Sequence, residues 1–185
     1  KNNSTSITYS VFPAGAGVIG AATGVINWDA AFSGIATITA TSTGLCGITS
    51  ANRLVTVNPT TGATSFIAGA VMVCQDAADE TYTALAANST SIVYSVLPAG
   101  AGVIGAATGI MNWAAAFSGP ATITATATGL CGTTSATRIV TVNPSTGVTS
   151  FLAGAVTVCQ NASDETYFAT AANSTSMVYS VAPAA

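Results

Sequence analysis

Residues 119–129 read GPATITATATG, and residues 34–44 read GIATITATSTG. In both stretches threonine alternates with isoleucine or alanine, a period of two that is typical of a β-strand with one buried face. Threonine suits the solvent face of such a strand because its branched side chain is already restricted at χ1. Glycine bounds both stretches and allows the chain to turn. The pattern therefore predicts two long strands and an all-β fold.

The two stretches lie 85 residues apart, and the same spacing recurs along the whole chain. A shift of 85 positions aligns Trp28 with Trp113 and Arg53 with Arg138, and about three-quarters of the overlapped positions are identical. This period is too long for a solenoid unit but suits a small β-sandwich. Further short strands are expected at 66–74, 81–87, 92–97, 110–113 and 134–142. The sequence predicts tandem immunoglobulin-like β-sandwich repeats.

Proline and glycine in 58–62 and 143–147 end strand pairing and mark linkers. On this division residues 63–147 form one complete repeat, and residues 1–62 form a repeat that lacks its first strands. Residues 148–185 supply the first strands of a further repeat, and they are too few to bury a core alone. We expect either a window of a longer array or a head-to-tail assembly. In the assembly, the C-terminal strands of one molecule complete the N-terminal sandwich of the next.

Charged residues are scarce, with 3 basic and 6 acidic side chains among 185 and no histidine. A surface that binds the phosphate backbone of a nucleic acid needs many lysine or arginine side chains, so no nucleic-acid partner is expected. Without histidine there is no Ser-His-Asp or Cys-His catalysis and no imidazole metal ligand. Glycine, proline and polar residues interrupt every long apolar stretch, so no membrane span is expected. We predict a chain that is not an enzyme and has no cofactor or metal site.

The four cysteines support the division into repeats. Cys74 and Cys131 lie in the complete repeat, 57 residues apart, and we predict a disulfide between them. Cys46 and Cys159 would then pair with cysteines outside the chain. Pairing of Cys46 with Cys74 across the linker and four free thiols are the alternatives, whereas zinc is disfavoured because no Cys-x-x-Cys spacing exists. Disulfides would place the protein outside the cytoplasm.

Two pairs of adjacent carboxylates, at 79–80 and 164–165, are the candidates for acid–base chemistry. Neighbours on a strand point to opposite faces, so they cannot act on one substrate, and we expect a solvated strand edge. Calcium binding with Asp76 is a weaker hypothesis, since the second copy has Asn161 there. Arg138 is expected to pair with a carboxylate of its own repeat.

An ordered set of motifs resembles a known repeat type. The motifs are Val-Cys-Gln (73–75), Thr-Tyr-Thr-Ala (81–84), Tyr-Ser-Val-x-Pro-Ala-Gly-Ala-Gly (94–102), Asn-Trp (112–113), Phe-Ser-Gly-x-Ala-Thr-Ile-Thr-Ala (117–125), Cys-Gly (131–132) and Arg-Ile-Val-Thr-Val-Asn-Pro (138–144). Together they resemble the tandem Ig-like (PKD-like) repeats of giant cell-surface and secreted proteins of Bacteroidota. That group includes gliding-motility adhesins and other cargo of the type IX secretion system. The resemblance implies an extracellular β-sandwich array and carries over no catalytic residue.

These observations favour a non-catalytic extracellular array that forms a stalk or filament at the cell surface. Its partners would be neighbouring repeats or other copies of the chain, and surface polysaccharide is a further class of partner. Low charge favours such contact because little electrostatic repulsion opposes it. The alternative is a carbohydrate- or surface-binding module of a secreted protein. That module would need exposed aromatic side chains, and the chain holds only 2 tryptophans, 5 tyrosines and 6 phenylalanines.

Overall fold

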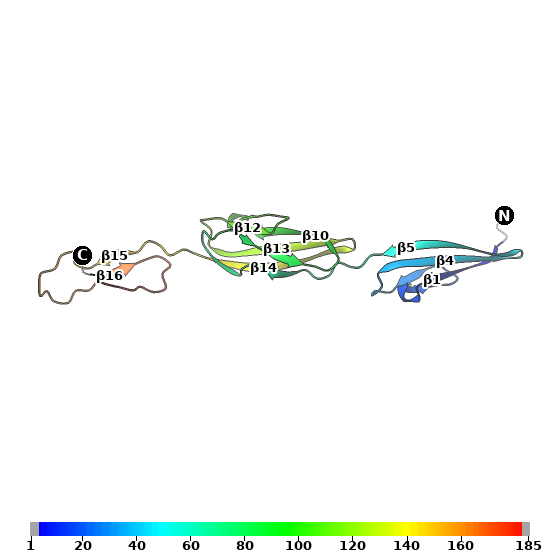
Figure 1. Cartoon of the computed structure of the whole chain (residues 1–185), viewed down its shortest axis with the longest axis horizontal. Helices are drawn as coiled ribbons and strands as arrows, with labels where there is room; N and C mark the ends of the chain where they lie inside the picture. Colours follow the sequence, from blue (N-terminus) through cyan, green and yellow to red (C-terminus); the bar gives the residue numbers. More distant parts are fainter. Residues whose placement is uncertain (1–3, 183–185) are drawn as a thin grey trace. The chain divides into compact units, whose positions relative to one another are not determined.

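The structure, a computed structural model, describes residues 4–182. Its regular elements are strands and two short 3₁₀ turns, and this range contains no α-helix, which confirms the prediction of an all-β chain (Figure 1). Consequently, no helix in it is long and apolar enough to cross a bilayer. Contacts divide the chain into two compact units, Lys1–Ser65 with Leu85–Ile92 and Thr126–Ser135, and Phe66–Ala84 with Val93–Ala125 and Ala136–Ala185.

We use the names first repeat, central repeat and C-terminal segment for residues 1–62, 63–147 and 148–185. The boundaries themselves stay predictions.

The first repeat contains one three-stranded antiparallel sheet. Its strands are β1 (Ser4–Phe12), β4 (Gly34–Gly44) and β5 (Gly47–Val57), in the order β1-β4-β5. The alternating threonine stretch forms β4, which pairs with β5 without interruption from Gly34↔Val57 to Gly44↔Gly47. β2 (Gly17–Ile19) and β3 (Ile26–Trp28) form a separate antiparallel pair. Strand β5 is therefore an edge strand.

The central repeat has a four-stranded sheet in the order β10-β13-β14-β7. These strands are β10 (Ser89–Leu97), β13 (Gly119–Gly129), β14 (Gly132–Asn143) and β7 (Met72–Cys74). Strand β7 runs parallel to β14 and covers the edge that β5 leaves open in the first repeat.

A second sheet of the central repeat has the order β11-β12-β8, from β11 (Gly102–Ile104), β12 (Ile110–Trp113) and β8 (Glu80–Thr81). β6 (Ser65–Ala68) and β9 (Thr83–Leu85) form a further pair. The short strands β6 to β9 all come from the first part of the repeat.

The core of the central repeat lies between side chains of these two sheets. One side supplies Tyr82, Ala101, Met111 and Trp113, and the other supplies Ala121, Ile123, Val140 and Val142. In β13 the alanine and isoleucine positions are buried and the threonines between them are more exposed, as the alternation predicts. The sequence alternation also predicts core positions at Ile92, Tyr94, Val96, Met111 and Trp113. Tyr94, Met111 and Trp113 are buried, whereas Ile92 and Val96 are half-buried.

The C-terminal segment contains only β15 (Ser150–Ala153) and β16 (Phe168–Thr170), which pair antiparallel. None of its described residues, 148–182, is buried. This agrees with the expectation that so short a stretch cannot bury a core alone.

Candidate functional site

The predicted Cys74–Cys131 disulfide is not present in the structure. All four cysteines are free and exposed. Cys74 pairs with Asn143 at the end of β14, whereas Cys131 immediately precedes the start of that strand. A strand of 12 residues spans about 40 Å, and a disulfide needs Cα atoms within about 7 Å. The predicted pairing was wrong because sequence spacing does not reveal which end of a hairpin a cysteine occupies.

Each thiol of the central repeat lies next to a linker asparagine. The Sγ of Cys131 donates to the carbonyl oxygen of Asn58 over 3.5 Å. Cys74 is in register with Asn143, and the backbone N–H of the following residue, Gln75, donates to the Asn143 carbonyl oxygen. Asn58 and Asn143 are equivalent positions, 85 residues apart. Cys131 follows the linker that contains Asn58, and Cys74 precedes the linker that contains Asn143. The two cysteines therefore lie at equivalent linker positions, on opposite sides of them.

Two carboxylates of the central repeat, those of Asp79 and Glu80, act as hydrogen-bond acceptors in the fold. Asp79 Oδ1 accepts from Asn112 Nδ2 over 2.8 Å, and Glu80 Oε1 accepts from the backbone N–H of Ala70 over 3.0 Å. The described residues contain no group of three or more His, Cys, Asp or Glu side chains that could hold a metal ion. Asp79 and Glu80 thus each accept a hydrogen bond within the central repeat.

Arg138 does not pair with a carboxylate as expected. Its Nη1 donates to the carbonyl oxygen of Gly69, and its guanidinium lies 5.1 Å from the centre of the Phe66 ring. Both partners come from the β6–β7 region, so the arginine fastens that region to β14. Sequence reasoning missed this contact, although identical residues stand at all three positions one period away, at Arg53, Gly154 and Phe151.

Tyr82 is the buried centre of the region that covers the core. Its side chain is inaccessible to solvent, and its ring packs edge-on against Trp113 with centroids 6.5 Å apart. Burial, reinforced by the nearby Glu80 carboxylate, raises the pKa of Tyr82 to about 12. The phenol thus stays neutral at every physiological pH.

Residues 64–84, which we call the cover, contain Phe66 and Gly69, which contact Arg138, and Tyr82, which packs against Trp113. By the shift of 85 positions, the equivalents of the cover would fall before residue 1. The side chains beneath are consequently less protected: Ile26, Trp28 and Val57 are half-buried and Arg53 is exposed. Their equivalents Met111, Trp113 and Val142 are buried in the central repeat. We call this uncovered surface the open face.

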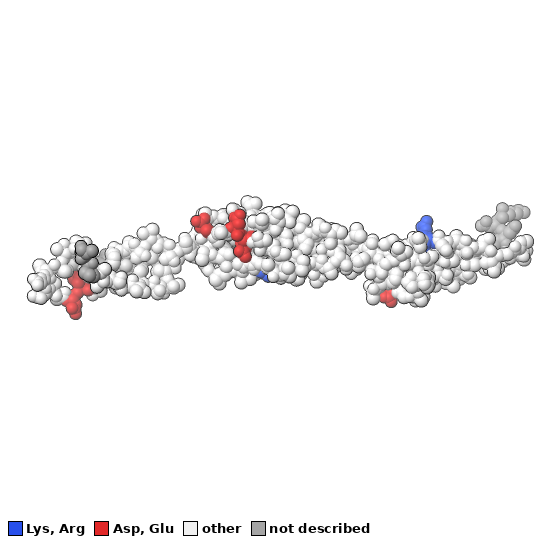
Figure 2. Space-filling view, in the orientation of Figure 1, with Lys and Arg blue, Asp and Glu red and all other residues white. Residues whose placement is uncertain are grey.

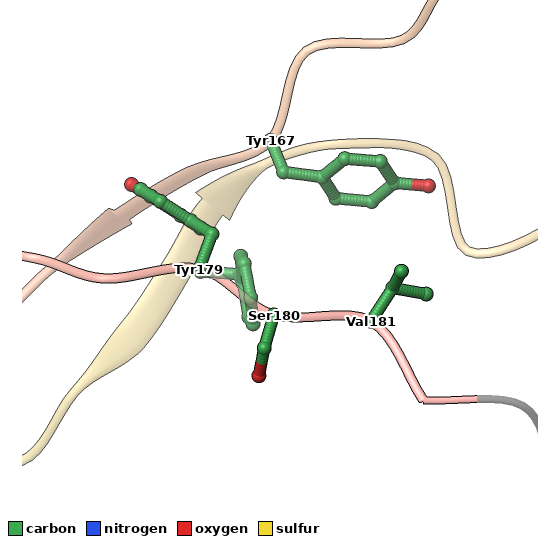
Figure 3. Close-up of a pocket in the computed structure, with 5 residues that line it drawn as sticks. Tyr167, Tyr179, Ser180 and Val181 are labelled. Carbon is green, nitrogen blue, oxygen red and sulfur yellow. The ribbon is translucent and has the colours of Figure 1, made fainter.

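The C-terminal segment contains the equivalent of the cover without anything beneath it. Phe151, Tyr167 and Tyr179 line an open pocket of about 550 Å³ together with Ser180 and Val181. Figure 3 shows the Tyr167 ring above Val181 with open space between them. Tyr167 is 44% exposed, whereas its equivalent Tyr82 is fully buried.

Exposed aromatic side chains distinguish the structural interpretation from the carbohydrate-binding one. Within residues 63–147 every aromatic side chain is buried or half-buried. The most exposed aromatics, Phe12, Phe151 and Phe168, lie in the two incomplete stretches. The aromatic side chains of residues 63–147 are thus turned largely inward.

No family model and no curated protein matches the chain. Among solved structures, the chain is similar to a four-repeat fragment (EC1-4) of Drosophila N-cadherin, with 19% identity and a TM-score of 0.46, over 76% of this chain and 41% of that one. It is also similar to human protocadherin-24 EC1-2, with 14% identity, a TM-score of 0.43 and coverage of 75% and 81%. The titin domains z1z2, solved in complex with telethonin, match at 13% identity and a TM-score of 0.31, again over 75% and 81%. The chain spans less than half of the N-cadherin fragment.

Proposed function

We propose that the chain is a non-catalytic structural or adhesive module of an extracellular array built from tandem immunoglobulin-like β-sandwich repeats. One observation carries this proposal. A stretch with its own two-sided core, residues 63–147, lies between stretches that bear the same motifs but leave the equivalent side chains uncovered. Such a sequence is suited to repetition, because each complete copy can close a core of its own.

The surface supports a role in contact. Only 9 of 185 residues are charged, and the face seen in Figure 2 has charged side chains at only a few points. Neighbouring molecules would meet little electrostatic repulsion. Edge strand β5 carries Arg53 as its one charged side chain, so it is weakly protected against pairing with another chain.

The resemblance to Bacteroidota repeats and the absence of histidine point in the same direction. The array would form a stalk or filament outside the cell, with neighbouring repeats or other copies as partners and surface polysaccharide as a further class. Its exposed threonines and alanines would make weak contacts whose strength comes from repetition.

Surface labelling tests this function. An antibody raised against residues 63–147 should label intact cells of the source organism, and electron microscopy should place the label on extended surface structures. A cytoplasmic protein serves as the control for cell integrity. Labelling that requires permeabilised cells would overturn the extracellular assignment, and labelling of dispersed particles would overturn the stalk or filament.

A further inference from the structure

The linkers at 58–62 and 143–147 are places where a cysteine approaches the backbone of the linker. We propose that, wherever one complete repeat follows another, Cys74 of the first and the equivalent of Cys131 in the second form a disulfide across the linker. This inference rests on the proposed role as an array of tandem repeats, and it assigns a covalent modification to the junction. Residues 63–147 show both sides of such a junction, because they follow one linker and precede the next.

The stretch that follows a linker holds it by hydrogen bonds. For the linker at 58–62, Asn88 Nδ2 donates to the Thr60 carbonyl oxygen over 2.9 Å. The hydroxyl of Thr61 donates to the Gly132 carbonyl oxygen over 2.8 Å. Both bonds come from turns at the start of the central repeat and at the β13–β14 hairpin. The linker is therefore fixed in register against these turns.

The thiol of Cys131 lies against the first residue of the same linker. Its Sγ donates to the carbonyl oxygen of Asn58 over 3.5 Å. Cys131 directly precedes Gly132, so the hydrogen bond from Thr61 to Gly132 also fixes the turn that carries the thiol. The structure thus holds this thiol at one particular atom of the linker.

The stretch that precedes a linker holds it as well. The backbone N–H of Gln75 donates to the Asn143 carbonyl oxygen over 2.7 Å. The Gln75 side chain accepts from the N–H of Ser145 over 3.1 Å and from its hydroxyl over 3.2 Å. Cys74 comes just before Gln75 and lies in register with Asn143 across the parallel pair of β7 and β14. The end of β7 that carries the thiol is therefore fixed against the linker.

One linker makes both sets of contacts at the same time. Ser145, which binds Gln75 of the preceding stretch, also accepts from Asn173 Nδ2 of the following stretch over 2.8 Å. That second bond is the equivalent of the one from Asn88 to Thr60 at the other linker. The contacts seen on the two sides are thus compatible, and they can be combined at a single junction.

The combined contacts place two thiols on the same side of one carbonyl group. Asn58 and Asn143 are equivalent, and both linkers have the sequence Asn-Pro-x-Thr-Gly. The Asn143 carbonyl oxygen points toward β7, because it accepts from Gln75, and a carbonyl oxygen has a second lone pair. A thiol placed against this oxygen, as Cys131 is placed against Asn58, would lie on the β7 side, next to Cys74.

The positions of the two cysteines favour a bond between repeats and exclude one within a repeat. They lie at opposite ends of β14, so each repeat carries one thiol at each of its junctions. Paired strands lie about 4.7–4.9 Å apart, which places the Cα of Cys74 about that far from the linker asparagine. A disulfide joins Cα atoms about 4.4–6.8 Å apart. Both cysteines are exposed, so a dissolved oxidant reaches them.

A small-molecule disulfide such as oxidised glutathione supplies the oxidation. One cysteine thiolate attacks the oxidant and forms a mixed disulfide, with release of one thiol. The second cysteine thiolate then displaces the remaining half as another thiol. The two cysteine thiols lose two electrons and two protons in total, and the oxidant is reduced to two thiols. The product restrains bending at the linker, as a stalk requires.

An extended chain tests the proposal. Residues 1–185 followed directly by a second copy of residues 101–185 continue the 85-residue period and give two complete repeats in a row. After incubation of the dilute monomer with oxidised glutathione, peptide mapping without reduction should find Cys74 bonded to the added copy of Cys131. Residues 1–185 alone are the control, and in them Cys74 should carry only glutathione or stay free.

Two serine variants of the extended chain distinguish this bond from unspecific oxidation. Cys74→Ser should abolish the bond and leave the added copy of Cys131 reactive towards a maleimide. Cys46→Ser is the matched control and should leave the bond intact, because Cys46 lies far in sequence from the linker at 143–147. A bond between Cys74 and the original Cys131, a mixture of pairs, or no bond within the extended chain would overturn the proposal.

Amide hydrogen exchange measures the restraint on the linker. In the extended chain, oxidation should slow exchange of the Ser145 N–H, which binds Gln75, about 10-fold, because the bond opposes local opening. The Cys74→Ser variant should show no such change. Equal exchange in the oxidised and reduced chains would contradict the restraint.

These outcomes are separable from the test of the proposed function. Absence of the bond in the extended chain, alongside labelling of intact cells, would refute the disulfide across the linker and leave the proposed function standing. Formation of the bond, alongside labelling only of permeabilised cells, would overturn the extracellular assignment and support the geometry of the junction.

Discussion

The first and central repeats contain nearly the same residues and differ in what covers them. Ile123 and Val140 are fully buried in the central repeat, while the equivalent Ile38 and Val55 are only half-buried. The strands themselves form in both, with β4 and β13 of equal length. The alternating pattern is thus sufficient for the sheet, whereas burial depends on residues 64–84, which lie earlier in the chain. A core between two sheets is a contact between sequence segments, and one half of it alone has little stability.

The largest difference is expected for the two tryptophans. Trp113→Ala should lower the free energy of unfolding of the central repeat by about 3–5 kcal/mol, since a large cavity would open in a closed core. Trp28→Ala should cost less than about 1.5 kcal/mol in the dilute chain, because the open face can collapse onto the smaller side chain. Urea unfolding followed by circular dichroism measures both. Equal losses would contradict the difference in burial.

A smaller effect is expected at high pH. Because the pKa of Tyr82 is raised from 10.0 to about 12 in the folded state, its contribution is complete below pH 10 and is lost as the pH rises towards 12. The loss should amount to about 2–3 kcal/mol. Urea unfolding at pH 9 to 12 measures it.

Tyr82→Phe sharpens this test. The Tyr82 hydroxyl is buried and finds no hydrogen-bond partner within the described chain, so phenylalanine should be tolerated at neutral pH. The variant should lose less stability than the original chain between pH 10 and 12. Tyr167→Phe, at the exposed equivalent position, is the control and should change neither value. An unchanged alkaline slope in Tyr82→Phe would show that another group causes it.

The sequence predicted the strands well and the long-range contacts poorly. The threonine alternation located β4 and β13, because a period of two is a local property. Of the predicted core positions, Tyr94, Met111 and Trp113 are buried, whereas Ile92 and Val96 are half-buried. The cysteine pairing failed because it depends on the parallel contact of β7 with β14, between residues about 70 apart. Nothing in the local pattern of either strand specifies that contact.

The lower burial in residues 1–62 follows from the repeat register, since the shift of 85 positions leaves these residues without equivalents of β6–β9. The repeat register could not predict which contacts the cover makes. Arg138 contacts the carbonyl oxygen of Gly69 and the Phe66 ring, whereas its charge alone suggests a carboxylate partner.

The smallest expected effect concerns the two arginines. Arg138→Met should destabilise the central repeat by about 1–2 kcal/mol, since it removes a charge-assisted hydrogen bond and a cation–π contact while keeping an apolar stem. Arg53→Met should change the stability of the dilute chain by less than about 0.5 kcal/mol, because Arg53 is exposed. Urea unfolding of both variants measures the difference, and equal losses would contradict the different surroundings of the two arginines.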